Sequence, residues 1–191
     1  MNKIFFIGCT HFNHTNIIKY CQRPFQSVEE MNETIIKNWN DKIDVEDVVY
    51  FLGDFALNCS PEWACELVDK LYGKKYFIRG NHDERLLKDK NFFFKFTWVR
   101  KQHFLYIDNH IILLTHYEKP NFKIDKTIKY DFHFYAHDHA KIPTKLKSSS
   151  LYNVGVDANN FSPVELNEII NRLKLLNKNE KYYIIKQGVI I

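Results

Sequence analysis

The sequence predicts an α/β fold, and three observations lead to this prediction. Short apolar runs rich in β-branched and aromatic residues recur along the chain, as is typical of buried strands. Helical patterns with N-terminal capping signals separate the first three of these runs. The chain has 191 residues, of which 45% are hydrophobic, and it shows no internal repeat or linker. This length and composition favour a single domain over residues 1–191.

The first half of the chain alternates strands with helices. A capping box of Ser27 and Glu30 opens the first helix, whose apolar residues then recur at spacings of three and four. Ser60 and the following proline open the second helix, Pro61–Leu71. The strands that we expect around these helices are Lys3–Ile7, Val48–Leu52 and Lys75–Ile78. Such alternation is typical of a parallel sheet.

In the second half, strands follow strands. Asp108-Asn109 reads as the turn of a hairpin. A capping box of Ser162 and Glu165 predicts a further helix over Pro163–Leu176. The remaining expected strands are Phe104–Ile107, Ile111–Leu114, Phe132–Tyr135 and a closing hairpin of Tyr182–Ile185 with Val189–Ile191. The segments most typical of loops are 120–129 and 141–150.

Charge and composition limit the function classes only weakly. The net charge of +4 permits a nucleic acid or another phosphate-bearing partner without requiring one. No stretch approaches the roughly 20 apolar residues of a membrane span, so we expect a cytoplasmic protein without a membrane partner. The four cysteines show no CxxC spacing, and we expect reduced thiols. Oligomeric state is left open.

Polar side chains follow five of the predicted strands, at the point where each strand ends. They are Cys9 and His11; Asp54; Asn81, His82 and Asp83; His116; and His137 and His139. Each residue alone has an ordinary explanation, such as a turn cap for Asp54 or a buried, hydrogen-bonded imidazole for His116. Chance does not explain five such coincidences. In open α/β sheets, ligands bind beyond the carboxyl ends of the strands, which makes this edge the candidate site.

These residue types suit a pair of divalent cations. Two neighbouring cations need a bridging carboxylate together with neutral nitrogen and oxygen donors on rigid supports. Asp54 offers the bridge and Asn81 an amide oxygen. The imidazoles come from His11, His116, His137 and His139. His82 is next to Asn81 and points elsewhere, so it is free to act as a general acid.

The motifs together resemble those of the calcineurin-like metallophosphoesterase superfamily. The family pattern of DxH, GD, GNHD, a lone His and GHxH is matched, in order, by CTH at 9–11, GD at 53–54, GNHD at 80–83, TH at 115–116 and AHDH at 136–139. The resemblance implies a four-layer α/β/β/α sandwich of two mixed sheets flanked by helices. It also implies two divalent metal ions, for which Mn, Fe and Zn are the candidates, and hydrolysis of phosphate esters, in particular diesters.

The resemblance further implies a role for each site residue. His11, Asp54 and His139 would hold the first metal, with Cys9 in the position of a fourth ligand, and Asp54, Asn81, His116 and His137 would hold the second. A metal-activated hydroxide would attack phosphorus, and His82, positioned by Asp83, would protonate the leaving oxygen. His14 and Arg23 are candidate phosphate contacts, although Arg23 could equally fix its loop.

Two residues depart from the family pattern. Ala136 replaces a glycine, which is a mild change if the backbone there has a negative φ. Cys9 replaces the aspartate of DxH; its thiolate could bind Zn or Fe, or a protonated thiol could leave the first metal with three ligands. The competing hypothesis is therefore a degenerate phosphoesterase that binds a ligand or partner without turnover.

The sequence does not determine the size of the substrate. A small diester such as a cyclic nucleotide and an exposed nucleic-acid end are both compatible with a chain of this length. The aromatic cluster of Phe92, Phe93, Phe94, Phe96 and Trp98 could stack bases, but core packing or self-association is the favoured interpretation.

Overall fold

Two mixed sheets pack against each other in the computed structural model, which describes residues 2–125, 127–139 and 150–174. The first sheet has the order β4-β3-β2-β1-β9, and all its neighbours are parallel except β1 and β9. Its strands are β1 (Ile4–Ile7), β2 (Val48–Phe51), β3 (Lys74–Ile78), β4 (Val99–Arg100) and β9 (Val164–Glu165). Parallel β1, β2 and β3 therefore end at the same edge.

The second sheet has the order β5-β6-β7-β8, in which β5 and β6 are antiparallel and the other pairs are parallel. Its strands are β5 (Gln102–Ile107), β6 (His110–Thr115), β7 (Phe132–Tyr135) and β8 (Leu151–Asn153). Ile107 pairs with His110, which leaves Asp108 and Asn109 as the two-residue turn that the sequence predicts. Asp108 adopts the positive φ of 50° that such a turn requires.

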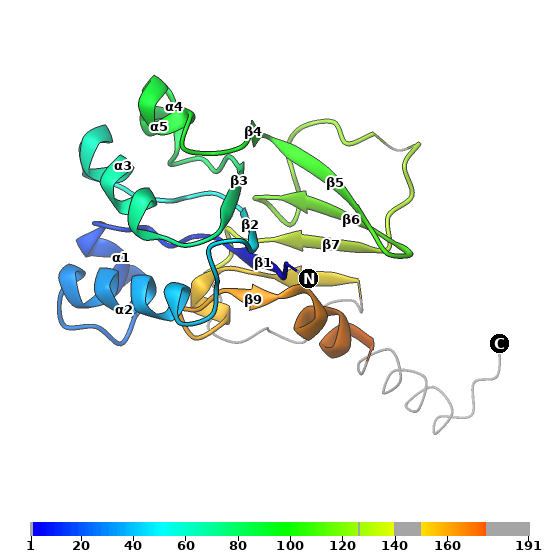
Figure 1. Ribbon diagram of the computed structural model, residues 1–191, viewed down its shortest axis with the longest axis horizontal. Coiled ribbons are helices and arrows are strands. Elements are labelled where there is room, and N and C mark those ends of the chain that lie inside the picture. The colour runs from blue at the N-terminus through cyan, green and yellow to red at the C-terminus, as the bar shows by residue number, and fades with distance from the viewer. Residues whose placement is uncertain (1, 126, 140–149, 175–191) are drawn as a thin grey trace.

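Helices cover the outer face of the first sheet, and the second sheet covers its inner face (Figure 1). The helices are α1 (Thr15–Tyr20), α2 (Val28–Asn40), α3 (Pro61–Lys70), α4 (Glu84–Leu87) and α5 (Lys90–Phe93), and η1 (Val156–Ala158) is a short 3₁₀ turn. Both predicted caps are present, because the Ser27 and Ser60 side chains accept hydrogen bonds from the N–H groups of Glu30 and Trp63.

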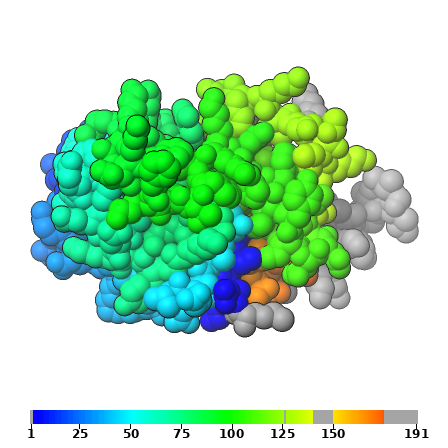
Figure 2. All heavy atoms as spheres, turned by 45° about the horizontal axis from the view of Figure 1, so that its top comes forward, coloured from blue at the N-terminus to red at the C-terminus, as the bar shows by residue number. Residues whose placement is uncertain are grey.

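Alternation along β1 shows how the two cores form. Phe5 and Ile7 point into the core beneath the helices, where they meet α2 residues such as Trp39. Phe6 points the other way, into the core between the sheets, and its ring lies edge-on to Phe134 of β7 at 5.0 Å. The sheets flanked by helices confirm the predicted fold class, and Figure 2 shows the N-terminal half and the second sheet adjoining as one body.

The prediction of a helix over Pro163–Leu176 is wrong for its first residues. Val164 and Glu165 form β9, which pairs with Phe6 and Phe5 of β1, and residues 166–174 are helical. Val164 is buried between the sheets, and its segment pairs with the otherwise open edge of β1. These tertiary contacts outweigh the local capping signal. The end of this helix, the predicted closing hairpin and most of the loop 141–150 lie outside the described residues.

The aromatic cluster divides between core and surface. Phe92 and Phe96 are buried beneath the helices, as the favoured interpretation predicts, whereas Phe93 and Phe94 are exposed. None of the helices in the described ranges is long and apolar enough to cross a membrane. The four cysteines are free thiols, as expected.

Candidate metal centre

The site forms where the strands of both sheets end. Beyond β1 and β2 the chain continues to pair, because the Cys9 N–H donates to Gly53 O at 2.8 Å and the His11 N–H donates to Asp54 O at 3.1 Å. Parallel β6 and β7 deliver His116 and the segment 136–139 to the same place, where the Ala136 N–H donates to His116 O at 3.0 Å. The loops that carry the candidate residues are thus held by backbone hydrogen bonds to one another.

Backbone strain is concentrated in these loops. Cys9, His11, Asp54 and His137 all have positive φ values, at 53°, 49°, 60° and 39°. Non-glycine residues rarely adopt this conformation, and it persists only where the surrounding structure enforces it, most often at functional sites. Ala136 does not have a positive φ, so its replacement of the family glycine is the mild change that we expected.

Asp54 is the carboxylate at the middle of the site. Its Oδ2 lies 3.6 Å from Nε2 of His11 and 3.3 Å from Nε2 of His116, and its Oδ1 accepts the His82 N–H at 2.9 Å. Burial raises the pKa of Asp54, but the hydrogen bond and charge of His116 outweigh that effect and lower the pKa to about 2. The group is therefore an anion flanked by two imidazoles.

His116 has a fixed tautomer that presents its other nitrogen to Asp54. Its Nδ1 lies 2.7 Å from the carbonyl oxygen of Leu52, which can only accept, so Nδ1 carries the proton. Its Nε2 lies 3.1 Å from Nδ1 of His137 as well as 3.3 Å from Asp54. In a tetrahedral site with metal–nitrogen bonds of about 2.0–2.1 Å, two ligand atoms lie about 3.4 Å apart. The observed separations are close to that distance.

His11 offers the clearest test of whether the residues fit a metal ion. The side chain is buried, and neither ring nitrogen has a hydrogen-bond partner. Burial lowers the pKa of His11 to about 2, so the ring is neutral. A buried imidazole without partners is unfavourable by about 1–3 kcal/mol for each unpaired group, whereas a cation between His11 and Asp54 would satisfy it. The donor set therefore fits a divalent metal.

His139 is held by a carboxylate that the sequence analysis did not assign. Its Nδ1 lies 2.8 Å from Oδ2 of Asp157, and Asp157 is in turn held by two hydrogen bonds from Arg23, at 2.9 and 2.8 Å. Burial lowers the pKa of His139, but the hydrogen bonds to Asp157 and Cys21 raise it to about 9. The same carboxylate orients the His139 ring and increases the basicity of its other nitrogen, which would have to lose its proton to bind a metal ion.

Of the two roles that the sequence left open for Arg23, its contacts favour the structural one over contact with a substrate phosphate. Arg23 is only 4% exposed, and besides Asp157 its guanidinium donates to the carbonyl oxygens of Thr10 and Cys9 at 2.8 Å. No donor is left to reach a phosphate, because the remaining N–H faces the sulfur of Met31. Arg23 instead fixes the first loop and orients Asp157, which is the structural alternative that the sequence left open.

Cys9 lies between the two groups of candidate ligands. Its Sγ is within 4.8 Å of ligand atoms of His11 and His139 and also within 4.8 Å of ligand atoms of Asp54 and His116. Burial, followed by the charges of Asp54 and Asp157, raises the pKa of Cys9 well above its ordinary value. The thiol is therefore protonated in the metal-free protein, and only a bound cation would favour the thiolate.

Asn81, His82 and His14 lie at the margin of this cluster. Asn81 and His82 are exposed, and Oδ1 of Asn81 accepts a hydrogen bond from Tyr117 at 3.2 Å. The ring of His82 lies 5.4 Å from that of His11, within the reach expected of a group acting on a bound substrate. His14 is buried, its Nδ1 has no partner, and its ring lies 5.8 Å from that of His11.

Asp83 holds the loops together through hydrogen bonds to backbone N–H groups. Its carboxylate is fully buried and accepts three backbone N–H groups, from Asp54 at 2.8 Å, Phe55 at 2.9 Å and Gly80 at 2.7 Å. It therefore fastens the GNHD loop to the loop that carries Asp54. Any effect of Asp83 on His82 acts through this loop geometry.

The GNHD loop approaches Asp54 so closely that Gly80 has no room for a side chain. A Cβ at Gly80 would lie 2.2 Å from Oδ1 and 2.7 Å from the backbone nitrogen of Asp54. We expect Gly80→Ala to displace Asp54, to lower the free energy of unfolding by about 1–3 kcal/mol and to weaken metal binding. Urea unfolding and metal titration would check this. Unchanged stability together with unchanged metal affinity would contradict the close packing of the two loops.

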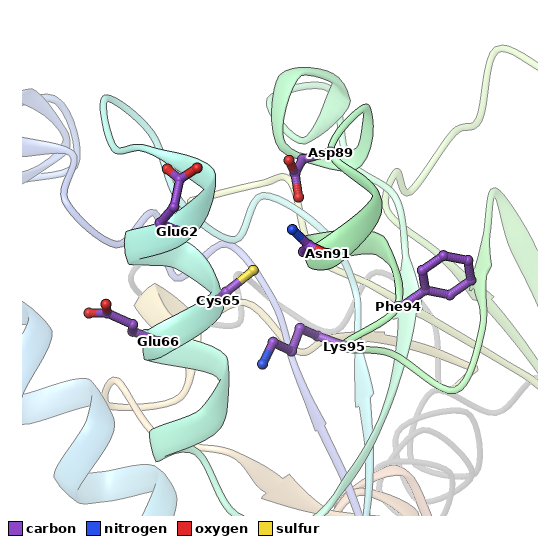
Figure 3. Close-up of a pocket in the computed structure, with 7 residues that line it drawn as sticks. All are labelled: Glu62, Cys65, Glu66, Asp89, Asn91, Phe94 and Lys95. Atoms are coloured by element: carbon purple, nitrogen blue, oxygen red, sulfur yellow. The ribbon is translucent and has the colours of Figure 1, made fainter.

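A pocket between α3 and α5 lies outside this centre (Figure 3). It is lined by Glu62, Cys65, Glu66, Asp89, Asn91, Phe94 and Lys95, none of which is a predicted site residue. Cys65 points from α3 toward the α5 segment in this view. The candidate site is therefore identified by the metal-ligand residues that follow the strands, and not by the presence of a pocket.

Comparison with known proteins gives a family, a relative in sequence and a similar solved structure. A family model described as calcineurin-like phosphoesterase matches residues 2–141. The uncharacterised protein MJ1445 of Methanocaldococcus jannaschii is 39% identical over 189 residues, covering 94% of each chain. The crystal structure of AQ665, a protein of unknown function from Aquifex aeolicus, aligns with a TM-score of 0.72 at 24% identity, covering 90% of this chain and 100% of that one, which supports the fold.

Proposed function

Because the chain belongs to the calcineurin-like phosphoesterase family, we propose that it hydrolyses phosphodiesters with a pair of divalent metal ions. Family membership itself supports the broader statement that the protein is a metal-dependent hydrolase of phosphate esters. The preference for diesters and the number of ions are our proposal. The observation that supports it most is the buried Asp54 carboxylate between His11 and His116, with both His11 nitrogens unpaired.

Two groups of residues would hold the ions. In the proposal, His11, His139 and Cys9 would hold the first ion, His116, His137 and Asn81 would hold the second, and Asp54 would contribute to both. A pair of divalent cations supplies Lewis acidity toward the phosphoryl oxygens and lowers the pKa of water toward neutrality. Asn81 would offer its amide oxygen, which also accepts the hydrogen bond from Tyr117 and has a second lone pair.

The chain's own residues then carry the proton and the positioning. His82 stands at the exposed margin of the centre, where we propose that it donates a proton to the leaving oxygen. Its N–H bond to Oδ1 of Asp54 fixes the backbone from which the ring projects. Asp157, held by Arg23, keeps the Nδ1–H of His139 engaged and leaves Nε2 for the first ion. His14 is proposed to contact the substrate phosphate beside His11.

The metal preference should follow from Cys9. Thiolate is a softer ligand than carboxylate and suits Zn or Fe better than Mn. The experiment is hydrolysis of a chromogenic phosphodiester by the purified protein loaded with Mn, Fe or Zn. We expect turnover by the wild type with Zn or Fe, and a shift of preference toward Mn in Cys9→Asp. Cys65→Ser, on α3 and away from the centre, should behave like the wild type.

The alternative is a degenerate phosphoesterase that binds without turnover. Activity only in Cys9→Asp would support that alternative, since it would mean that the native first site is half-built. Absence of turnover with every metal in both proteins would contradict the proposal of an enzyme. We also propose that the protein acts in the cytoplasm, which its four free thiols support.

A further inference from the structure

A second pocket opens directly beside the proposed metal centre. It has a volume of about 470 Å³, within the range of small-molecule sites, and its lining includes Arg79, Asn81, Glu84, Lys101, Tyr117 and Phe122. Asn81 and Tyr117 join it to the centre, because Tyr117 hydrogen-bonds Asn81 and its ring lies 4.6 Å from that of His137. A substrate held at the metal ions would extend into this pocket without leaving the protein surface.

Two cations and one carboxylate lie in the lining of the pocket. Arg79 follows β3 and Lys101 follows β4, and the two strand ends are joined by the Arg79 N–H bond to Arg100 O at 2.9 Å. Among the described residues, neither side chain forms an ion pair within 4.0 Å. The carboxylate in the lining, Glu84, is paired with Lys88 at 3.0 Å, and the charge of Arg79 acts on it over a longer distance. The lining therefore has a net positive charge, with two cations and one carboxylate, and this charge favours binding of an additional anion.

Aromatic surface accompanies this charge. Tyr117 and Phe122 are both partly buried, so each presents part of a ring to the pocket. Every nucleobase has a face that stacks on such rings, and stacking beside a backbone-binding cation is how single strands are held without sequence preference. A small diester with one charge would leave Arg79 and Lys101 unused.

We infer that this pocket binds the nucleotide next to the scissile phosphate, so that the substrate is the end of a single-stranded nucleic acid. Its next phosphate would lie against Arg79 and Lys101, and its base against Tyr117 and Phe122. The inference rests on the proposed phosphodiesterase function for the location of the scissile phosphate. Tyr117 would then have two roles, since it also contacts Asn81.

A matched pair of substrates tests the inference. Thymidine 5′-(p-nitrophenyl phosphate) and its 3′-phosphorylated form differ only in the second phosphate, and each consumes one water and releases p-nitrophenol. We expect the 3′-phosphate to raise kcat/KM in the wild type. The ratio of the two kcat/KM values should fall about tenfold in Arg79→Gln/Lys101→Gln, since each exposed charge contributes modestly. Lys70→Gln/Lys90→Gln removes the same charge from exposed positions outside the pocket and should preserve the ratio.

Equilibrium binding separates this inference from the proposed function. Anisotropy of a fluorescein-labelled tetrathymidylate, and of its RNA counterpart, measures affinity without turnover. If Arg79→Gln/Lys101→Gln binds the oligonucleotide more weakly than the control variant, the result supports nucleotide binding in this pocket. If no diester is hydrolysed as well, only the proposed phosphodiesterase function fails. An unchanged substrate ratio, or equal oligonucleotide affinity in both double variants, would overturn the inference.

Discussion

Asp54→Asn is expected to remove both metal ions and to abolish turnover. The Asp54 Oδ2 faces His11 at 3.6 Å and His116 at 3.3 Å, so one charge serves both groups of ligands. Asparagine keeps the size of the side chain and an oxygen that can accept the His82 N–H, but it carries no charge to bridge two cations. We expect metal affinity to fall by more than about 100-fold, because even residues that only orient ligands contribute 10–100-fold.

Elemental analysis of protein purified without chelator measures this effect. Asp69→Asn is the matched control, because Asp69 makes an exposed ion pair with Lys95 on the helical face and its loss removes the same charge. A full metal content in Asp54→Asn would remove Asp54 as the bridge.

His82→Ala is expected to lower turnover by about 10²- to 10⁴-fold while the metal content stays normal. The ring of His82 is exposed at the margin of the centre, and alanine retains the backbone N–H that Asp54 accepts. The loss should depend on the leaving group. A diester with an alkoxide leaving group needs a proton from His82 and should lose more activity than a p-nitrophenyl diester, whose leaving group is stable as an anion.

Steady-state kinetics with the two diesters, alongside metal analysis, would check this prediction. His110→Ala, at the start of β6 in the β5–β6 hairpin, is the control histidine and should change neither rate. Loss of metal in His82→Ala, or an equal loss of rate with both leaving groups, would contradict the role of general acid.

Local sequence patterns predicted the main elements well because their signals are themselves local. The caps at Ser27 and Ser60 act within three residues, and the Asp108-Asn109 turn is complete in itself. β9 was missed because its two residues are strand only through their pairing with β1, across most of the chain. The four-residue helices α4 and α5 are too short to show an apolar period.

The sequence predicted those site residues that directly follow a strand. It did not predict the contacts between residues far apart in the sequence. His11, Asp54, His116 and His139 each end an apolar run, and the structure brings them together. The pairing of Arg23 with Asp157 spans 134 residues, so no local pattern distinguishes this buried pair from a phosphate contact. Asp157 ends the stretch YNVGVD at 152–157, which contains none of the five motifs from which the site was predicted.

The three backbone bonds of Asp83 were equally hidden in the sequence. GNHD suggests a carboxylate beside its histidine neighbour, but burial turns Asp83 inward to the N–H groups of the adjacent loop. Such N–H groups must find acceptors when buried, and an aspartate at a loop base is well suited to accept several.

Anomalous diffraction from crystals grown with Zn or Mn tests the central proposal, a dinuclear centre bridged by Asp54, most directly. We predict two peaks about 3.5–4 Å apart, one on each side of the Asp54 carboxylate. The first should be ligated by His11, His139 and Cys9 and the second by His116, His137 and Asn81. A single peak, or peaks away from Asp54 at full metal loading, would contradict the proposal.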